Sequence, residues 1–377
     1  MKIAIVTLHG YENYGNKLQN FALTRVILNL DIDVKSIDID LIGSNGREDS
    51  KQTSLVETKN GISAIMTILR LIKRRFLRSK HSIFAKQLMN QRRLNLLSFS
   101  RDYLNEQTYD LHFDKLASID SEYDFFVVGS DQVWNPTAVA NKEYKYFLTF
   151  ASDSKKISYA ASFGVASLQE QDKKKYIPLL NSFEHISVRE KAGQRIIHDL
   201  LNIEVPILVD PTLLLSKSDW LSIIIPDENK PTKNFLLTYF LSEVNASTNR
   251  YISHFAKIHK LIIVRLNDIH DKNRFTLGPN QFLDYFNSAS IIFTDSFHGS
   301  VFSILFERPF VVFNRGNMNS RIETLLSIFH FEDRHWDNVK KHRDFFSVDF
   351  SNVQSIQAVE KNRSISFLKK AFYKPLH

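Results

Sequence analysis

A histidine stands among small polar residues between two apolar runs in IIFTDSFHGSVFSILFERPFVVF, residues 291–313. The first run predicts a strand and the second a helix, so the polar cluster lies at a strand-to-helix junction. Free N–H groups at a helix start favour phosphate or carboxylate. His298 can exchange a proton near neutral pH. Ser296 and Ser300 can cap the helix or bind an anion, and Gly299 lets a ligand approach the backbone.

A plainer interpretation of this cluster stays open, in which Ser296 is an ordinary N-cap and His298 is packed and satisfied. Other predicted strands also end in polar residues. In YDFFVVGSDQ, Asp131 and Gln132 are candidate binding residues, although a turn with a capping Asp explains them equally well. In HISVREKAG, Arg189 follows a strand, and the alternative there is an ion pair with Glu190 or Asp210.

The loop GYENYGNKLQN near the N-terminus is a further candidate binding segment. It places Asn13, Tyr14, Asn16 and Gln19 between a predicted strand and a predicted helix. It lacks the G-x-G-x-x-G fingerprint, and the chain contains no Walker A loop, G-x-S-x-G elbow or H-E-x-x-H. The scattered histidines show no metal-ligand spacing. The sequence therefore predicts neither a cofactor nor a metal.

The elements that position these junctions alternate between strands and helices, which predicts an α/β fold built on parallel sheets. Strands are expected near residues 2–8, 33–40, 124–128, 156–161, 185–189, 205–209, 234–241, 261–266, 291–296 and 309–314. The rhythm restarts after residue 216, so we expect one Rossmann-like domain over 1–215, a second over 216–350, and a helix over 351–377. The cleft between the domains is the expected ligand site.

The composition of the chain further restricts its possible chemistry and location. The chain has 377 residues, 43% of them hydrophobic, and no cysteine, which excludes disulfides and thiol chemistry and favours a reducing compartment. No window approaches the ~18 apolar residues of a membrane span, and no signal peptide is predicted. Net charge is +8, and residues 58–101 hold eleven Lys or Arg and no acid.

Within this basic segment, residues 69–93 have the pattern of a basic amphipathic helix, with Leu69, Ile72, Phe76 and Leu77 near helical spacing. Two interpretations stay open: a solvated helix packed on its own domain, or peripheral attraction to anionic lipid. Nucleic acid is not an expected partner, because no zinc-finger or RNA-recognition pattern accompanies the charge.

Taken together and in order, the motifs resemble the polysaccharide pyruvyl transferase family. The matching segments are GYENYGNKLQNFAL, YDFFVVGSDQVWNP, KISYAASFG, ISVREKAG, VDPTLLL and SASIIFTDSFHGSVFSILFERPFVVF. They cover most of the chain except about residues 45–110 and the C-terminal tail. The resemblance implies a GT-B-like fold, with two Rossmann-like domains facing each other across a cleft.

The resemblance also implies a reaction: transfer of the enolpyruvyl carbons of phosphoenolpyruvate to a sugar of a bacterial capsule or exopolysaccharide, which gives a pyruvate ketal. His298-Gly299 matches the family's histidine and glycine, Arg189 an arginine after the mid-chain strand, and Arg321 a later basic residue. Some members carry arginine where this chain has Ser296, so Arg315 or Arg321 must supply that charge. No metal is implied.

The implied division of labour places the donor on the second domain, at residues 296–300, and the acceptor on the first, at residues 13–19 and 131–132. The resemblance implies a cytoplasmic enzyme, and a lipid-linked acceptor would place it at the inner face of the plasma membrane. Two alternatives stay open: a GT-B glycosyltransferase that uses a nucleotide sugar, and a non-catalytic scaffold, which would be expected to lose the His298-Gly299 pair.

Overall fold

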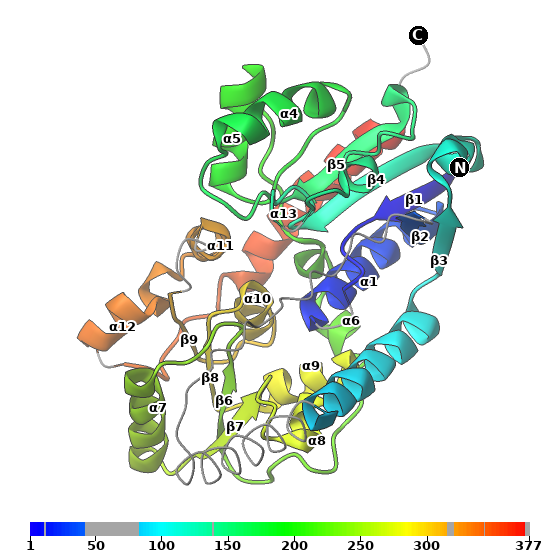
Figure 1. Ribbon diagram of the computed structural model, residues 1–377. Coiled ribbons are helices and arrows are strands. Elements are labelled where there is room, and N and C mark those ends of the chain that lie inside the picture. Colours follow the sequence, from blue (N-terminus) through cyan, green and yellow to red (C-terminus); the bar gives the residue numbers. More distant parts are fainter. Residues whose placement is uncertain (11–12, 42–82, 138, 315–319, 343, 374–377) are drawn as a thin grey trace, which may run out of the picture.

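Short apolar runs rich in β-branched residues form buried strands, as at Lys2–Val6, where four of five residues are buried. The computed structural model describes residues 1–10, 13–41, 83–137, 139–314, 320–342 and 344–373. These residues form two all-parallel sheets with helices packed around them, which Figure 1 shows one above the other. The predicted α/β class with two Rossmann-like units is confirmed.

The first unit is built on a five-stranded sheet in the order β3-β2-β1-β4-β5. Its strands are β1 (Lys2–Val6), β2 (Asp33–Leu41), β3 (Glu106–Leu111), β4 (Phe125–Asp131) and β5 (Lys156–Ala161). Its helices are α1 (Tyr14–Leu28), α3 (Glu143–Tyr146), α4 (Glu170–Asn181) and α5 (Lys191–Leu201), and residues 83–103 are also helical. The register of β1 pairs Val6 with Ile37 on one side and with Val128 on the other.

Full strands were expected at 185–189 and 205–209, and this prediction was wrong. His185, Val188 and Ile207 add only isolated parallel bridges beyond β5. Conversely, β3 was missed, because EQTYDL is polar and forms an edge strand with no fully buried position. A sheet edge of this kind gives little apolar signal in the sequence.

The second unit has a four-stranded sheet in the order β7-β6-β8-β9. Its strands are β6 (Phe235–Tyr239), β7 (Ile262–Leu266), β8 (Ile291–Thr294) and β9 (Phe310–Val312). The later helices are α6 (Lys217–Leu221), α7 (Ala246–Ile258), α8 (Lys272–Phe275), α9 (Pro279–Ser288), α10 (Phe297–Leu305), α11 (Ser320–Phe329), α12 (Trp336–His342) and α13 (Val353–Phe372).

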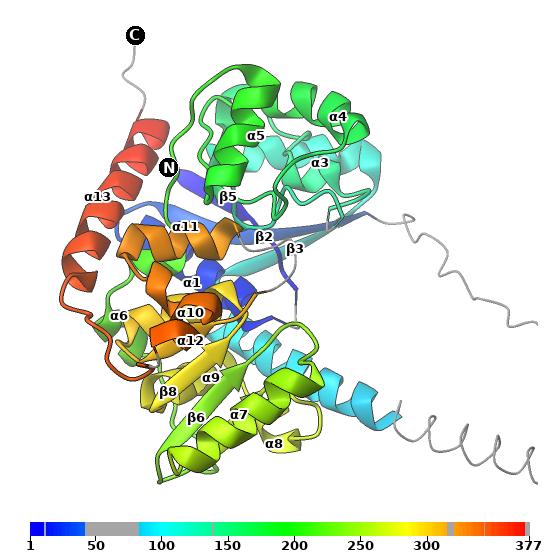
Figure 2. The same ribbon diagram turned by 90° about the vertical axis from the view of Figure 1, so that its left-hand side faces the viewer.

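The last helix, α13, returns to the first unit, as Figure 2 shows. The ring of Phe372 lies 5.9 Å from that of Phe125 at the start of β4. The two units also share a continuous apolar cluster. The domain boundary at 215/216 stays a prediction, since packing continues across it.

Trp220 is central to this shared cluster. Its side chain is fully buried, 5.6 Å from the ring of Phe21 in the first unit and 5.1 Å from that of Phe302 in the second. Its indole N–H donates to the carbonyl of Thr212 at 3.0 Å. Trp220 therefore holds a helix of each unit against the segment that joins them.

The basic segment lies only partly within the described residues, since 42–82 fall outside them. Its described part does not pack on one unit alone. Arg92 is buried, stacks on Tyr14 at 4.4 Å and donates to Asn267 of the second unit at 2.8 Å. Asn95 donates to the carbonyl of Thr276. Among the described residues, no helix is long and apolar enough to cross a membrane.

The shared cluster generates a stability prediction. Trp220→Ala should lower the free energy of unfolding by about 3–5 kcal/mol, because it removes a large buried side chain and leaves a cavity between the units. Leu221→Ala is the matched control: Leu221 is 41% exposed, so its change should stay within about 0.5 kcal/mol. Urea denaturation followed by circular dichroism measures both. Equal effects would show that the two units do not depend on this contact.

Candidate functional site

The junction between β8 and α10 has a well-defined start. Ser296 is the N-cap, and its hydroxyl accepts a hydrogen bond from the Gly299 N–H at 3.2 Å. A Cβ on Gly299 would lie 2.4 Å from Thr294 Oγ1, so glycine is needed for the helix to start this close to the strand. Ser300 donates to the carbonyl of Ser296 at 3.0 Å. The hydroxyls of both serines therefore stabilise the helix start, and their role in anion binding stays a prediction.

His298, in the first turn of α10, reaches across to the first unit. Its ring lies against the start of α1, where a Cβ on Gly15 would come within 2.0 Å of His298 Nδ1. On its other side, Nε2 lies 3.7 Å from Asp210 Oδ2. The residue is only 5% exposed. The imidazole is thus held between two segments of the first unit, although its own backbone belongs to the second.

Arg189 lies in a buried ion cluster. Its guanidinium donates to Asp210 Oδ2 at 2.5 Å and to Asp131 Oδ1 at 3.1 Å. It also lies over the ring of Phe297 at 4.3 Å, and its side chain is 1% exposed. An ion pair with Asp210 was the alternative that the sequence left open. A direct role for Arg189 toward a donor phosphate stays a prediction, and both terminal nitrogens already have acidic partners.

Asp210 is the acceptor that several segments share. It accepts from the Thr212 backbone N–H at 3.0 Å and hydroxyl at 2.7 Å, and lies 3.1 Å from the Ser130 hydroxyl. Burial alone would raise the pKa of Asp210, but the charges of His298 and Arg189 and the Thr212 hydrogen bond hold it below its usual range. Asp210 is therefore an ionised carboxylate inside the protein.

The pKa values of the other two acidic side chains in the cluster, Asp131 and Glu190, shift in opposite directions. Burial would raise the pKa of Asp131, yet Arg189, His298 and Arg321 together lower it. Glu190 is also fully enclosed, and burial raises its pKa in spite of Arg189 and Arg321. It accepts hydrogen bonds from the Ser162 hydroxyl and the Phe163 N–H.

Arg321, on α11, approaches the Asp131 carboxylate from the second unit. Its guanidinium is 3.8 Å from Asp131 Oδ1. With its amide oxygen turned toward the guanidinium, Gln132 accepts hydrogen bonds from Arg321 at 2.9 and 3.1 Å. Arg315, the other candidate for the charge that Ser296 lacks, lies outside the described residues.

A small pocket at the boundary of the units is lined by most of these groups. It is lined by Asn13, Asp131, Gln132, Leu241, Asp295, Ser296, Phe297, His298, Arg321 and Ile322. Several predicted residues do not line it: Arg189, Gly299 and Ser300 lie behind its wall. Sequence reasoning missed Phe297 and Asp295, and treated Asp210 only as a partner for Arg189.

Three residues of the N-terminal loop are committed to internal contacts instead. Tyr14 is fully buried and donates to the carbonyl of Leu277 at 2.9 Å. Gln19, also fully buried, donates to Thr7 at 2.8 Å and accepts from the Ser130 N–H at 3.1 Å. Asn16 is 8% exposed. Of the loop residues predicted to bind an acceptor, Asn13 alone lines the pocket, and it also caps α1.

The pocket lies where the order of strand addition reverses in each sheet. In the first sheet the chain order reverses between β1 and β4, and there Thr7 donates to the carbonyl of Ser130 at 3.1 Å. In the second it reverses between β6 and β8, and Asp295 accepts from the Leu241 and Ser242 N–H groups at 2.7 and 3.0 Å. Ligands of open parallel sheets bind at such switch points. Here the two switch points face each other.

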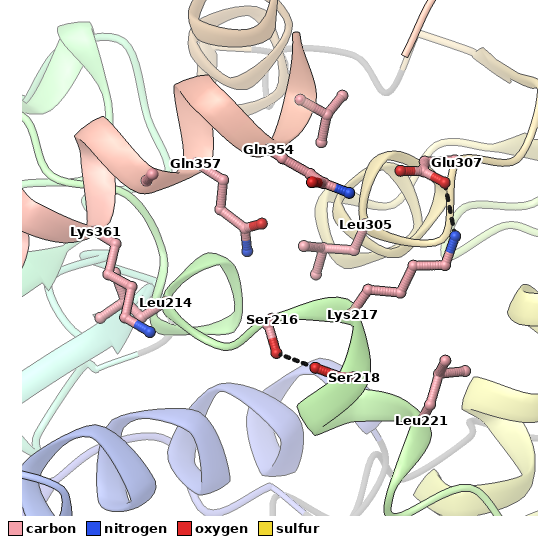
Figure 3. A pocket seen from close by; sticks show the side chains of 12 residues that line it. Leu214, Ser216, Lys217, Ser218, Leu221, Leu305, Glu307, Gln354, Gln357 and Lys361 are labelled. Carbon is pink, nitrogen blue, oxygen red and sulfur yellow. Dashed lines mark hydrogen bonds and ion pairs between the residues drawn. The ribbon is translucent and has the colours of Figure 1, made fainter. Parts of the chain in front are cut away.

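A larger pocket of about 1080 Å³ lies elsewhere and is shown in Figure 3. It is formed by α6, the end of α10 and the start of α13, with an ion pair between Lys217 and Glu307 at its edge. It is at the opposite end of α10 from His298, so volume alone does not identify the site. Within the ranges that the structure describes, no cluster of three or more His, Asp or Glu side chains could hold a metal ion.

Comparisons with known proteins identify a family for this chain. The model of a family described as polysaccharide pyruvyl transferase matches residues 13–317. The match includes every described residue of the His298 pocket except Arg321 and Ile322, which follow its end. Among curated proteins, none matches the chain.

Several solved structures are similar in overall fold. Methanocaldococcus jannaschii UDP-GlcNAc 2-epimerase, in complex with UDP-GlcNAc and UDP, is 13% identical over 97% of this chain and 99% of its own, with TM-score 0.45. An Anabaena protein in complex with UDP and glucose is 10% identical over 98% of each chain, with TM-score 0.43. A functionally uncharacterized Klebsiella pneumoniae protein is 11% identical over 67% and 83%, with TM-score 0.38. At these TM-scores the structures indicate nothing about the ligand of this chain.

The contact between Gly15 and His298 generates a prediction. Gly15→Ala should displace the imidazole and lower kcat at least about tenfold, because a shift of about 1 Å at a catalytic group is costly. Gly10→Ala is the control in the same loop, since its Cβ would meet only the flexible Asn16 amide, at 3.0 Å. Steady-state kinetics and thermal unfolding of both variants test this. Full activity in Gly15→Ala would mean that the position of His298 does not matter.

The ion cluster predicts a dependence of stability on pH. The pKa values of Asp131 and Asp210 are depressed in the folded state, so their contribution is present above the unfolded-state pKa of about 4 and is lost as pH falls. Asp210→Asn should cost about 3–5 kcal/mol at neutral pH and flatten this acid dependence.

Glu190→Gln is the control with opposite sign. The pKa of Glu190 is raised, so its contribution is fully present below the unfolded-state pKa and is lost as pH rises through the folded-state value. Removing the Glu190 carboxyl group should make stability fall more steeply as the pH is lowered. Denaturant titrations between neutral and acid pH measure both variants. An unchanged slope in Asp210→Asn would show that this carboxylate is not ionised in the folded protein.

Proposed function

The chain belongs to the polysaccharide pyruvyl transferase family, and from this premise we propose that it transfers the pyruvyl carbons of phosphoenolpyruvate to a sugar of a bacterial capsule or exopolysaccharide repeat unit. The product is a pyruvate ketal and the second product is phosphate. The observation that supports this proposal most directly is the enclosed His298, which meets an ionised carboxylate at the pocket where the two switch points face each other.

The proposed reaction proceeds by addition and then elimination. A proton is delivered to C3 of the enol, and a sugar hydroxyl adds to C2 and gives up its own proton, which leaves a tetrahedral C2 that still carries the phosphate. The C2–O bond to phosphate then breaks, and a second hydroxyl of the same sugar attacks C2 and loses its proton. The atoms balance with one phosphate released, and no redox partner is required.

His298 is the group placed to move these protons. It lines the pocket, and its Nε2 faces Asp210 while the opposite side of the ring rests on Gly15. These two contacts orient the imidazole before any substrate binds. A positioned acid or base of this kind contributes about 10²–10⁴-fold to rate.

In this proposal, the positive charge that binds the donor comes from Arg321 and from the start of α10. Arg321 lines the pocket, whereas Arg189 lies behind it with both terminal nitrogens bound to carboxylates. The first turn of α10 adds backbone N–H groups that have no intrahelical partner, together with the positive end of the helix dipole. We therefore assign the phosphate or carboxylate of the donor to Arg321 and the start of α10, and give Arg189 the task of holding Asp131 and Asp210.

The cellular setting is also part of the proposal. An acceptor built on a lipid carrier would place this enzyme at the cytoplasmic face of the plasma membrane. The basic residues expected to contact anionic lipid lie mostly in 69–82, outside the described residues. The adjoining helical residues 83–103 contact the second unit through Arg92 and Asn95.

The proposed acid or base role of His298 gives a kinetic prediction. His298→Asn should lower kcat by about 10²–10⁴-fold, because proton delivery is lost, while phosphoenolpyruvate still raises the thermal unfolding temperature. His254→Asn, on the exposed face of α7, is the control and should behave as the native chain. Turnover within a few-fold of the native chain would remove His298 from the mechanism. Stabilisation by UDP-sugars and not by phosphoenolpyruvate would favour a glycosyltransferase.

Substitutions of Arg321 and Arg189 should have different effects in a binding experiment. Arg321→Ala should weaken phosphoenolpyruvate binding by about 10- to 100-fold, as expected for loss of a charge-assisted hydrogen bond worth about 1.5–3 kcal/mol. Arg189→Ala should instead mainly lower stability, by about 3–5 kcal/mol, since it leaves two buried carboxylates unpaired. Arg363→Ala, half-exposed and paired only with Glu360, is the surface control. Calorimetry showing normal affinity in Arg321→Ala would mean that the donor binds elsewhere.

A further inference from the structure

The structure leaves the acceptor with half of its expected contacts, because Asn13, Asp131 and Gln132 line the pocket. Of the other first-unit residues that the sequence assigns to it, Tyr14 and Gln19 are fully buried and Asn16 is nearly so. The polar groups of Tyr14 and Gln19 bind Leu277 and Thr7. A sugar at His298 therefore needs a second surface beside the pocket.

Such a surface begins at Leu241, which lines both the His298 pocket and a neighbouring groove of about 1070 Å³. The groove follows the carboxyl ends of β6 and β7 and is bordered by α7, elements that lie together in Figure 1. Asp295 accepts from the Leu241 and Ser242 N–H groups, so the wall between the two spaces is tied to the end of β8. The groove therefore has a fixed position relative to His298.

The side chains of the groove suit a neutral polar ligand. Glu243, Asn249, Arg265, Asp268 and His270 offer both donors and acceptors. In the part of the chain that the structure describes, the side chains of Glu243 and Arg265 make no ion pair or hydrogen bond. A row of mixed donors and acceptors on a partly exposed surface matches the hydroxyl groups of a saccharide.

Charge argues against an anionic occupant. The groove continues past Asp268 and His270 into a second hollow that adds Asp271 and Lys272. Carboxylates and basic side chains are close to balanced over the two together, three against two, and Asp271 is itself paired with Arg274. A nucleoside diphosphate or a free phosphate would need a clear excess of positive charge.

We infer that this groove binds the saccharide of the acceptor, with the ring that follows the reacting sugar lying across Leu241 toward Asn249 and Asp268. Its place in the reaction rests on the function proposed above, but saccharide binding at these residues does not.

The absence of cysteine from the chain allows a direct test. Asn249→Cys places one thiol in the groove, and Ser253→Cys places one on the same helix, exposed and outside the groove. Each variant is treated with a bulky maleimide in the presence of lactose, α-mannobiose, UDP or inorganic phosphate. At several times its Kd, either disaccharide should slow labelling of the groove thiol about fivefold and leave the Ser253→Cys rate unchanged.

A second measurement uses the labelled proteins. Labelled Asn249→Cys should lose about tenfold or more in kcat/KM for a saccharide acceptor while phosphoenolpyruvate still stabilises it, and labelled Ser253→Cys should be unaffected. Protection by UDP or phosphate alone, or by none of the four, overturns the inference. Protection by a disaccharide with no transfer from phosphoenolpyruvate supports the groove and refutes the proposed function.

Discussion

The pairing of Arg189 with Asp210 and Asp131 is the interaction on which the site depends. It lies in an enclosed space where each ion would be costly alone, so removing any partner exposes the others to the full penalty of burial. Asp210 also receives the Thr212 N–H and faces His298. The first unit thereby presents a fixed carboxylate to a histidine of the second, and the geometry of this histidine, the proposed acid or base, is set by contacts between the units.

This arrangement explains why the pocket is small and polar while larger cavities lie elsewhere. The pocket is lined by one imidazole, one guanidinium and the start of a helix, and its two carboxylates, Asp131 and Asp295, already have partners in Arg189 and in the Leu241 and Ser242 N–H groups. Net attraction for an anion then comes from Arg321 and from α10, while Arg189 keeps the carboxylates from repelling it. A site built this way can bind a doubly charged donor without holding excess positive charge when empty.

Much of this could be predicted from the sequence, because strands and junctions are local. The β8–α10 junction, the position of His298 within it and the polar end of β4 follow from apolar runs and their breaks. The partner of His298 could not be predicted, since its approach to Gly15 depends on how two units pack. The roles of Tyr14 and Gln19 were obscured for the same reason: both read as a polar loop, yet both are buried by the second unit or by the β1–β4 boundary.

The same packing sets a constraint on substrate entry. His298 is nearly enclosed and its pocket borders both units, so donor and acceptor must approach along the boundary between them. Trp220 and the residues around it form a shared apolar cluster that includes Phe302 of α10, and this cluster resists separation of the units there. Movement that widens the pocket is therefore expected to pivot about this cluster and to leave the His298–Asp210 pair near the axis. Because groups near a pivot axis move little, the contact of His298 with Asp210 would then persist while access to the pocket changes.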